Sequence, residues 1–178
     1  MKKYVALLRG INVGGNNKVE MGQLKIVFEK LGFSDVSTYI NSGNVIFSAE
    51  VRKVDVGKIE KAIEKEFGFF VRTLVRDDVS IKKMVKEVDS TWQNDTEQKT
   101  DVLFLWEGYD SKKSMSLIKS NPDVDSLEYI AGAGAIVWHI LKKEYGKSGM
   151  NKFIGTEIYK NMTARNINTV RKLATLMR

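Results

Sequence analysis

The spacing of hydrophobic residues over positions 1–76 constrains the fold more than any other feature of this chain. Alternating apolar and polar residues are typical of strands, and apolar residues that recur every three or four positions are typical of helices. The spacing predicts, in order, a strand at 4–9, a helix at 21–31, strands at 36–40 and 45–47, a helix at 54–67 and a strand at 69–75. This β-α-β-β-α-β order is that of a ferredoxin-like unit.

The remaining residues show a second, similar arrangement. The spacing predicts a helix at 80–88, a strand at 101–106, a helix at 111–119, strands at 127–131 and 135–141, and closing helices at 147–160 and 164–177. The segment Tyr39–Phe47 resembles Tyr129–Val137, which suggests an internal duplication with Tyr39 equivalent to Tyr129. We therefore expect an α+β fold of two ferredoxin-like (βαββ-type) halves with antiparallel sheets and closing C-terminal helices, divided into subdomains at 1–76 and 77–178.

The chain contains no cysteine and one histidine. Without cysteine it has no disulfide, thiolate nucleophile or Cys-ligated zinc, which favours a reducing compartment. The apolar run before Arg9 is shorter than the roughly 7–15 residues of a secretory signal, and no run approaches the roughly 18 residues of a membrane span. We expect a cytoplasmic protein with no membrane association, and the oligomeric state is unknown.

Charge is distributed unevenly along the chain. The net charge of +7 is the sum of +5 over residues 1–76, −5 over residues 77–141 and +7 over residues 142–178. A local basic excess suggests an anionic partner. The alternative is that the basic C-terminal segment docks on the acidic middle segment of the same molecule.

A glycine- and asparagine-rich loop, Arg9–Lys18, follows the first predicted strand and precedes the first predicted helix. Glycines let successive backbone N–H groups point into one concavity that can hold a phosphate or carboxylate, and Arg9 and Lys18 would add positive charge. The loop is not a P-loop, because Asn16 follows Gly15 where a lysine is required, and it lacks the dinucleotide pattern G-x-G-x-x-G. It is therefore either an anion-binding loop or a turn that only reverses the chain.

Two further segments are rich in polar groups. The turn Asn41–Asn44 has more of them than a hairpin needs, and Thr163–Thr169 is predicted to open the last helix with Thr163 as its N-cap. Capping and a buried, hydrogen-bonded asparagine are the structural alternative for the second segment. We predict that the start of the last helix packs against the glycine loop in one basic pocket. The candidate ligand-binding residues are Arg9, Asn12, Gly14, Gly15, Ser42, Asn44, Arg165 and Asn166.

Catalytic and nucleic-acid-binding patterns are weak. His139 is alone on an apolar strand face, where a histidine is usually packed and hydrogen-bonded. No group of histidine, aspartate and glutamate has metal-ligand spacing, so we expect no metal and no cofactor. An RNA-binding sheet of the RRM type would need two or three stacking aromatics, and Tyr4 and Phe47 do not match that pattern.

Several long motifs resemble those of one bacterial family. They are Arg9–Gly15 (R-G-I-N-V-G-G), Leu31–Phe33, Thr38–Phe47 with its S-G-N turn, and Thr163–Asn166 followed by Thr169, Lys172 and Leu173. On these motifs the chain resembles domain-of-unknown-function family 1697 over nearly its whole length. Family members often have a tryptophan where this chain has Ile167, so the resemblance implies no stacking role at that position. It implies a two-part α+β fold and no activity.

The function that these patterns favour is binding of a small anionic or phosphorylated ligand at the glycine-rich loop. One alternative is an enzyme acting on such a ligand, although no nucleophile or metal set is recognisable. Another is a nucleic-acid-binding protein, which rests on charge and fold alone, and a purely structural or partner-binding role is the last.

Overall fold

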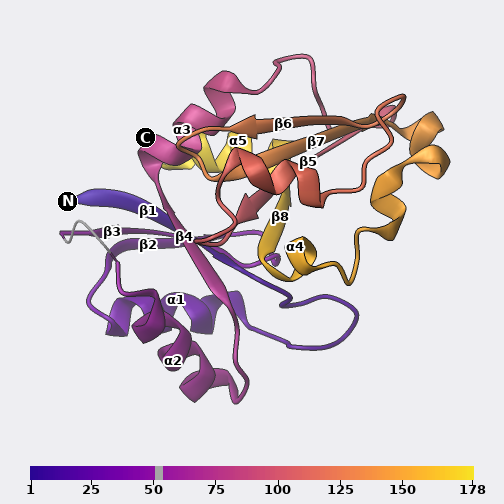
Figure 1. Cartoon of the computed structure of the whole chain (residues 1–178). Coiled ribbons are helices and arrows are strands. Elements are labelled where there is room, and N and C mark those ends of the chain that lie inside the picture. The colour runs from indigo at the N-terminus through magenta and orange to yellow at the C-terminus, as the bar shows by residue number, and fades with distance from the viewer. Residues whose placement is uncertain (51–53) are drawn as a thin grey trace. The chain divides into compact units, whose positions relative to one another are not determined.

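The computed structural model describes residues 1–50 and 54–178 (Figure 1). Within this range the chain forms two compact units, one comprising Met1–Asp78 with Thr175–Arg178 and the other comprising Val79–Ala174. Each unit contains one four-stranded sheet. Among the described residues, no helix combines the length and the apolar character that crossing a lipid bilayer requires.

The first unit has the element order predicted from the sequence. Its elements are β1 (Lys2–Leu8), α1 (Met21–Lys30), β2 (Ser34–Tyr39), β3 (Asn44–Ala49), α2 (Val56–Phe67) and β4 (Thr73–Asp77). The strand order β2-β3-β1-β4 places β1 between β3 and β4, antiparallel to both. This is the ferredoxin-like topology, so the prediction for this half is confirmed.

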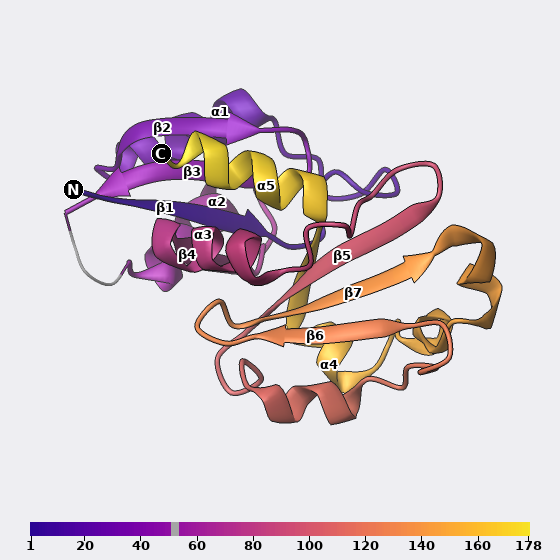
Figure 2. The same cartoon turned by 90° about the horizontal axis from the view of Figure 1, so that it is seen from above.

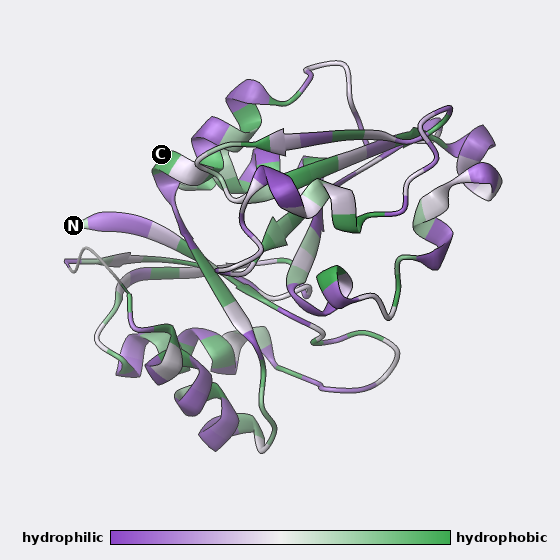
Figure 3. Cartoon of the chain, viewed as in Figure 1, coloured by the Kyte–Doolittle hydropathy of each residue, from purple (hydrophilic) through white to green (hydrophobic). Residues whose placement is uncertain are grey.

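Helices α1 and α2 cover the same face of the first sheet (Figure 1). Alternate residues of β1 and residues three or four positions apart on each helix meet there, as the two periodicities require. The core beneath the helices includes Tyr4, Ala6, Leu8, Leu24, Val27, Phe28, Phe47, Ile59 and Ile63. Figure 3 shows hydrophilic residues along the outer side of α2. That helix begins after Asp55, whose side chain accepts a hydrogen bond from Lys58 N, and ends at Gly68 in the left-handed conformation.

The second unit repeats the strand order of the first. Its elements, beginning at the last residue of the first unit, are α3 (Asp78–Glu87), β5 (Gln98–Leu105), η1 (Lys112–Leu117), β6 (Ser126–Ile130), β7 (Ala135–Leu141), η2 (Lys142–Lys147), η3 (Gly149–Lys152), α4 (Glu157–Lys160), β8 (Met162–Asn166) and α5 (Ile167–Leu176). The order β6-β7-β5-β8 makes β5 the counterpart of β1, with β7 and β8 antiparallel to it (Figure 2). The predicted α+β class with two antiparallel, ferredoxin-like halves is confirmed.

Two predicted helices of the second unit are wrong in type. Residues 111–119 contain only the 3-10 helix η1, and residues 147–160 contain η3 and the four-residue α4. Gly149 explains the second difference, because a Cβ at this position would lie 2.1 Å from the carbonyl oxygen of Lys119. The chain therefore passes close to another backbone segment there, and Gly155, at a φ of 88°, interrupts any right-handed helix further along.

The start of the last helix was also predicted wrongly. Thr163 is not an N-cap, because Met162–Asn166 forms the strand β8 paired with β5. Helix α5 begins at Ile167, and the side chain of Asn166 caps it by accepting a hydrogen bond from Thr169 N at 2.8 Å. The helix buries one stripe of side chains, which continues just past its end. It consists of Ile167, Val170, Leu173 and Met177.

The two hairpins correspond with a shift of one residue from the predicted match. The last pair before each turn is Tyr39 with Asn44 in the first unit and Ile130 with Ala135 in the second. Both turns therefore contain four residues, and Tyr39 corresponds to Ile130 rather than to Tyr129. Matching by residue type misses this shift, because the register of a hairpin is fixed by its turn type and loop length.

Candidate functional site

The glycine loop is a small hairpin that extends from the end of β1. Asn12 N donates a hydrogen bond to Asn17 O at 3.1 Å, and Asn16 N donates to Val13 O at 3.2 Å. The two residues at the tip, Gly14 and Gly15, have φ values of 60° and 80°. Positive φ at both central residues is the requirement of a type I′ turn, so the turn alone accounts for this glycine pair.

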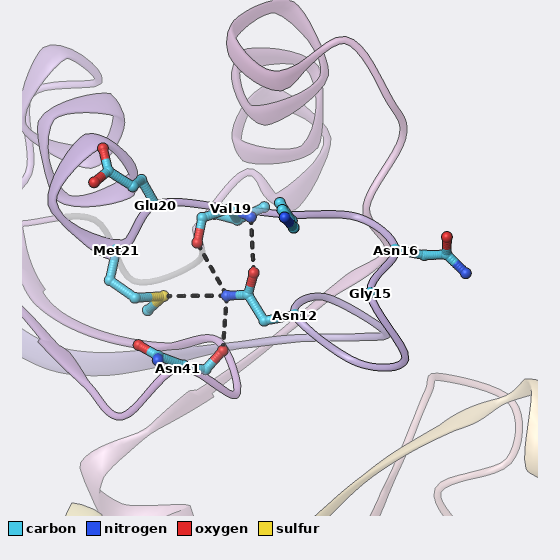
Figure 4. Close-up of a pocket in the computed structure, with 8 residues that line it drawn as sticks. Asn12, Gly15, Asn16, Val19, Glu20, Met21 and Asn41 are labelled. Carbon is cyan, nitrogen blue, oxygen red and sulfur yellow. Dashed lines mark hydrogen bonds between the residues drawn. The ribbon is translucent and has the colours of Figure 1, made fainter.

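Asn12 ties the loop together through its carboxamide (Figure 4). Its Oδ1 accepts a hydrogen bond from Val19 N at 2.8 Å, while its Nδ2 donates to Val19 O and to Asn41 O, both at 2.9 Å. The Sδ of Met21 lies 4.0 Å from the same nitrogen. Asn12 therefore joins the beginning of the loop to its end and to the turn between β2 and β3.

The turn between β2 and β3 packs closely on the end of β1. A Cβ at Gly43 would lie 2.8 Å from Leu8 Cβ and from Ile11 Cδ1. Asn44 is fully buried, and its Nδ2 donates to Tyr39 O at 2.9 Å and to Ser42 Oγ at 3.0 Å. Gly43 and Asn44 thus have structural roles that explain their presence in the S-G-N motif.

Ile40 in the same turn has an unusual backbone conformation. Its φ is 51°, although it is β-branched, and its side chain is about half exposed. A β-branched residue in the left-handed region is strained, and such strain is found more often near functional sites than elsewhere. The strained residue directly precedes Asn41, whose carbonyl receives the hydrogen bond from Asn12.

A pocket of about 560 Å³ lies between this turn, the end of the loop and the start of α1. Its lining combines apolar surface with three asparagines, one cation and one carboxylate. The lining residues are Asn12, Gly15, Asn16, Lys18, Val19, Glu20, Met21 and Asn41. In Figure 4 the side chains of Asn16 and Glu20 are directed away from the Asn12 amide.

Helix α1 begins at this pocket without a side-chain cap. Glu20 occupies the N-cap position but makes no capping hydrogen bond, and the first turn contains no acidic residue. The first N–H groups of a helix have no partner within the helix, and they carry the positive end of its dipole. Met21, the first residue of α1, lines the pocket, so the start of this helix lies beside it.

Only two of the predicted site residues, Asn12 and Gly15, line this pocket. The other predicted residues of the first unit lie in the same loop and turn but outside its lining. They are Arg9, Gly14, Ser42 and Asn44.

Arg165 and Asn166 belong to the second unit, in strand β8. The Arg165 guanidinium is buried and donates from Nη1 to Thr163 Oγ1 at 3.0 Å and to Ala164 O at 2.7 Å, and burial lowers the pKa of Arg165 to about 10. Such a residue supports its strand, so Arg165→Ala would cost stability. The predicted pocket shared with the Gly14–Gly15 loop stays a prediction.

The sequence reasoning missed Glu20 and Met21. Both sit at the junction of the loop with the first predicted helix. The sequence shows that the first turn of this helix has no acidic residue and that its N-cap position has no Ser, Thr, Asp or Asn. An uncapped helix start after a glycine loop is the pattern that could have identified them.

His139 is packed and hydrogen-bonded, as predicted. Its Nδ1 lies 2.9 Å from Thr100 Oγ1, and its ring stacks on Trp92 with 4.8 Å between the ring centroids. Over residues 1–50 and 54–178, no group of three histidine, aspartate or glutamate side chains could hold a metal ion. Tyr4 and Phe47 stack on each other in the core beneath α1 and α2, so they are not a base-stacking surface.

Comparison with known proteins places the chain in a family. The model of a family described as a protein of unknown function (DUF1697) matches residues 1–133. Among solved structures, the conserved bacterial protein SP0830 from Streptococcus pneumoniae is similar at 27% sequence identity, with a TM-score of 0.84 and 99% of each chain covered. No curated protein matches the sequence. Because the family match spans well over half of the 178 residues, the chain belongs to the DUF1697 family.

Proposed function

We propose that the first unit binds a small anionic ligand, such as a phosphorylated metabolite, in the pocket at the start of α1. The observation that carries this proposal is an uncapped helix N-terminus beside a pocket of about 560 Å³ whose lining includes three asparagines and a lysine. The pocket is within the usual size range for small-molecule sites. The cysteine-free composition supports a cytoplasmic location for this binding.

The ligand would meet three kinds of group. The first N–H groups of α1 would donate to its anionic oxygens, and the Lys18 ammonium would add a positive charge. The side chains of Asn16 and Asn41, for which the described residues provide no hydrogen-bond partner, would supply further donors and acceptors. Asn12 would hold the pocket in shape, since its carboxamide is already engaged by Val19 and Asn41.

Substitution of Glu20 tests the proposal most directly, because it should change anion binding in the opposite direction to substitution of Lys18. Its carboxylate lies at the same helix N-terminus, where it competes with a bound anion for the same positive potential. Removing the Glu20 charge should therefore strengthen anion binding, whereas removing the Lys18 charge should weaken it. A ligand held only by nonspecific surface charge would respond equally to any lysine of the first unit.

The experiment is a thermal-shift and calorimetric titration of the full chain with inorganic phosphate and a panel of phosphorylated small molecules, each paired with its unphosphorylated form. A ligand that binds the native state raises the melting temperature according to its concentration and Kd. We expect weaker binding in Lys18→Gln, tighter binding in Glu20→Gln and unchanged binding in Lys61→Gln, an exposed lysine on α2. The proposal is wrong if no phosphorylated compound stabilises the protein more than its partner compound, or if all three variants respond alike.

The enzyme and nucleic-acid-binding alternatives have weaker support. Among the described residues, no contact pairs a nucleophile with a base in the pocket, so an enzyme acting on the same ligand has no residue to favour it. A nucleic-acid-binding function would show itself in the same titration as binding to an oligonucleotide that falls steeply with salt.

A further inference from the structure

The connection between α3 and β5, residues 88–97, is tied to strand β7 and helix α5 of the second unit. We refer to it as the strap. Trp92 of the strap stacks on His139 of β7, with 7° between the ring planes. On α5, Asn168 Nδ2 donates to Asn94 O at 2.8 Å, and Arg171 Nη1 donates to Gln93 Oε1 at 2.9 Å. The strap therefore links the sheet to the beginning of the last helix.

The hydrogen bonds around Thr100 fix the tautomer of His139. The Thr100 hydroxyl has one proton, which it donates to Gln93 O at 2.7 Å. Its oxygen must then accept from His139 Nδ1, which lies 2.9 Å away, so Nδ1 carries the ring proton. The Nε2 atom of neutral His139 keeps its lone pair, and none of the described residues forms a hydrogen bond with it.

The charged groups near His139 lie on the strap and next to it. Asp89 Oδ1 accepts from Thr91 Oγ1 at 2.7 Å and from Thr91 N at 2.8 Å, and Asp95 Oδ1 accepts from Gln98 N and Glu97 N, both at 2.8 Å. These hydrogen bonds lower the pKa values of both aspartates, which therefore stay ionised in mild acid.

Other elements add two cations and one acid. Glu128 of β6 lies two residues from Ser126, the partner of His139, and therefore shares its face of the sheet. Lys142 Nζ donates to the main-chain oxygen of Asp95, Arg171 approaches from α5, and β6 presents the uncharged Ser126 opposite His139. Burial lowers the pKa of His139 below its ordinary 6.5, and this effect outweighs the attraction of Asp89 and Asp95, which acts in the opposite direction.

We propose that His139 is a proton-sensitive latch that holds the strap when neutral and releases it when Nε2 is protonated. In the closed state the neutral ring donates through Nδ1 and needs no acceptor at Nε2. Protonation places a charged N–H at a half-buried position where the described residues supply no acceptor. The open state, in which the ring is hydrated, then becomes more favourable, and the contacts of Trp92, Gln93 and Asn94 are lost together.

The pH dependence has a definite sign. The pKa of His139 is lower in the closed state than in a solvated imidazole, so the closed state binds the proton more weakly. The free energy that keeps the strap closed is fully present above about pH 6.5. It falls as the pH drops toward the lowered pKa of His139. At a pH below both pKa values, each pH unit that separates the closed-state pKa from that of a solvated imidazole raises the equilibrium constant for opening about tenfold.

The single histidine of the chain permits a direct test. Nitrogen NMR of the full chain at neutral pH should show His139 protonated at Nδ1, and a titration should show a pKa below 6.5. Hydrogen exchange of residues 88–97, corrected for the intrinsic effect of pH, should accelerate between pH 7 and pH 5 by the factor that the measured pKa requires. Asp89→Asn should lower the pKa of His139 further, because it removes an attracting charge.

The control is His139→Gln, which cannot take up a proton. In this variant the corrected exchange of the strap should not depend on pH over the same range. The proposal is overturned if wild-type His139 is protonated at Nε2 alone when neutral, if it titrates at or above 6.5, or if the strap's exchange keeps the same pH dependence in His139→Gln. The first two observations use the wild-type chain and do not depend on how the variant folds.

Discussion

Strands β1 and β5 hold the same central place in two sheets of the same strand order, yet the segments that follow them differ. The main-chain bonds that end both strands are equivalent. They are Leu8 N to Gly43 O (2.8 Å) and Arg9 N to Arg72 O (3.0 Å) in the first unit, and Leu105 N to Gly134 O (2.9 Å) and Trp106 N to Asn161 O (3.1 Å) in the second. After them, the first unit forms the glycine hairpin and the pocket, whereas the second passes directly to η1. Main-chain pairing sets the shared fold, and the connections carry the differences that bear on function.

The covers of the two sheets differ as well. The first sheet is covered by two amphipathic α-helices, whereas much of the second core comes from short helices and the loops between them. Short helices leave a larger share of their N–H groups without a partner inside the helix, and these groups need other acceptors. Buried Asp125 is one such acceptor. It accepts from Trp138 Nε1 (2.9 Å) and Ser148 Oγ (2.6 Å) at Oδ1, and from Asn121 N (2.7 Å) and Gly149 N (2.9 Å) at Oδ2.

The largest expected effect is on this carboxylate. Asp125→Asn replaces an acceptor oxygen by a donor and faces it with N–H or O–H groups, so we expect a loss of about 3–5 kcal/mol in the free energy of unfolding. Chemical denaturation measures the loss. Asp123→Asn is the matched control, because Asp123 is exposed and its substitution should change stability by less than about 0.5 kcal/mol. Equal effects of the two substitutions would contradict the role assigned to Asp125.

The pH dependence of stability provides a second test of the role of Asp125. Burial acts to raise the pKa of Asp125, but the hydrogen bonds from Ser148, Asn121, Trp138 and Gly149 together lower it below its ordinary 3.8. The carboxylate therefore stabilises the fold fully above that value, and this contribution is lost as the pH falls through the lowered pKa. Denaturation at a series of acidic pH values should show a smaller loss of stability in Asp125→Asn than in the wild type.

A smaller effect is expected at the turn that packs on β1. Gly43→Ala adds a Cβ only 2.8 Å from Leu8 Cβ at a φ of 80°, so we expect a loss of about 2–4 kcal/mol. Gly132, in the turn of the second unit, has a φ of 78°, but its nearest neighbour is the flexible end of Lys83 at 3.3 Å. Gly132→Ala should therefore reduce the free energy of unfolding only by the cost of placing alanine in the left-handed conformation, about 1–2 kcal/mol. If the two losses are the same, close packing is not what distinguishes the two turns.

The smallest of these effects concerns the loop found only in the first unit. Asn12→Asp keeps the acceptor for Val19 N but turns a carboxylate oxygen toward Val19 O and Asn41 O, and aspartate tolerates the φ of 55°. We expect a loss of about 1–3 kcal/mol and faster hydrogen exchange at Val19. Asn16→Asp at the exposed tip should leave both quantities nearly unchanged, and a similar loss there would show that charge alone is responsible.

The sequence predicted the elements whose partners are local and missed those whose conformation depends on distant contacts. Leu24 and Phe28 recur at helical spacing, and this spacing alone was enough to predict that they face the core. Strand β8 was mistaken for the start of a helix because Thr163 is a good cap in isolation, while its pairing partner Phe104 lies far away in the sequence. The segment around Gly149 was mistaken for a helix because nothing local indicates the approach of Lys119.

The site was predictable to a similar degree. The glycine loop was found from composition, and Gly15 and Asn12 do line the pocket. The role of Asn12 was not predictable, because the carbonyl of Asn41 that receives its hydrogen bond lies 29 positions away. Arg165 looked like an anion ligand because an exposed helix start was assumed, but pairing within the second sheet makes it a buried strand residue.

The division of the chain into Met1–Asp78 with Thr175–Arg178 on one side and Val79–Ala174 on the other has a consequence for biosynthesis. The second unit is an insertion within the first, and Lys3 Nζ donates a hydrogen bond to the main-chain oxygen of Arg178. Domains generally fold as the ribosome releases them, N-terminal segment first. The first unit, although it starts earlier, receives residues 175–178 only after the whole second unit has been made, so it cannot complete its contacts first.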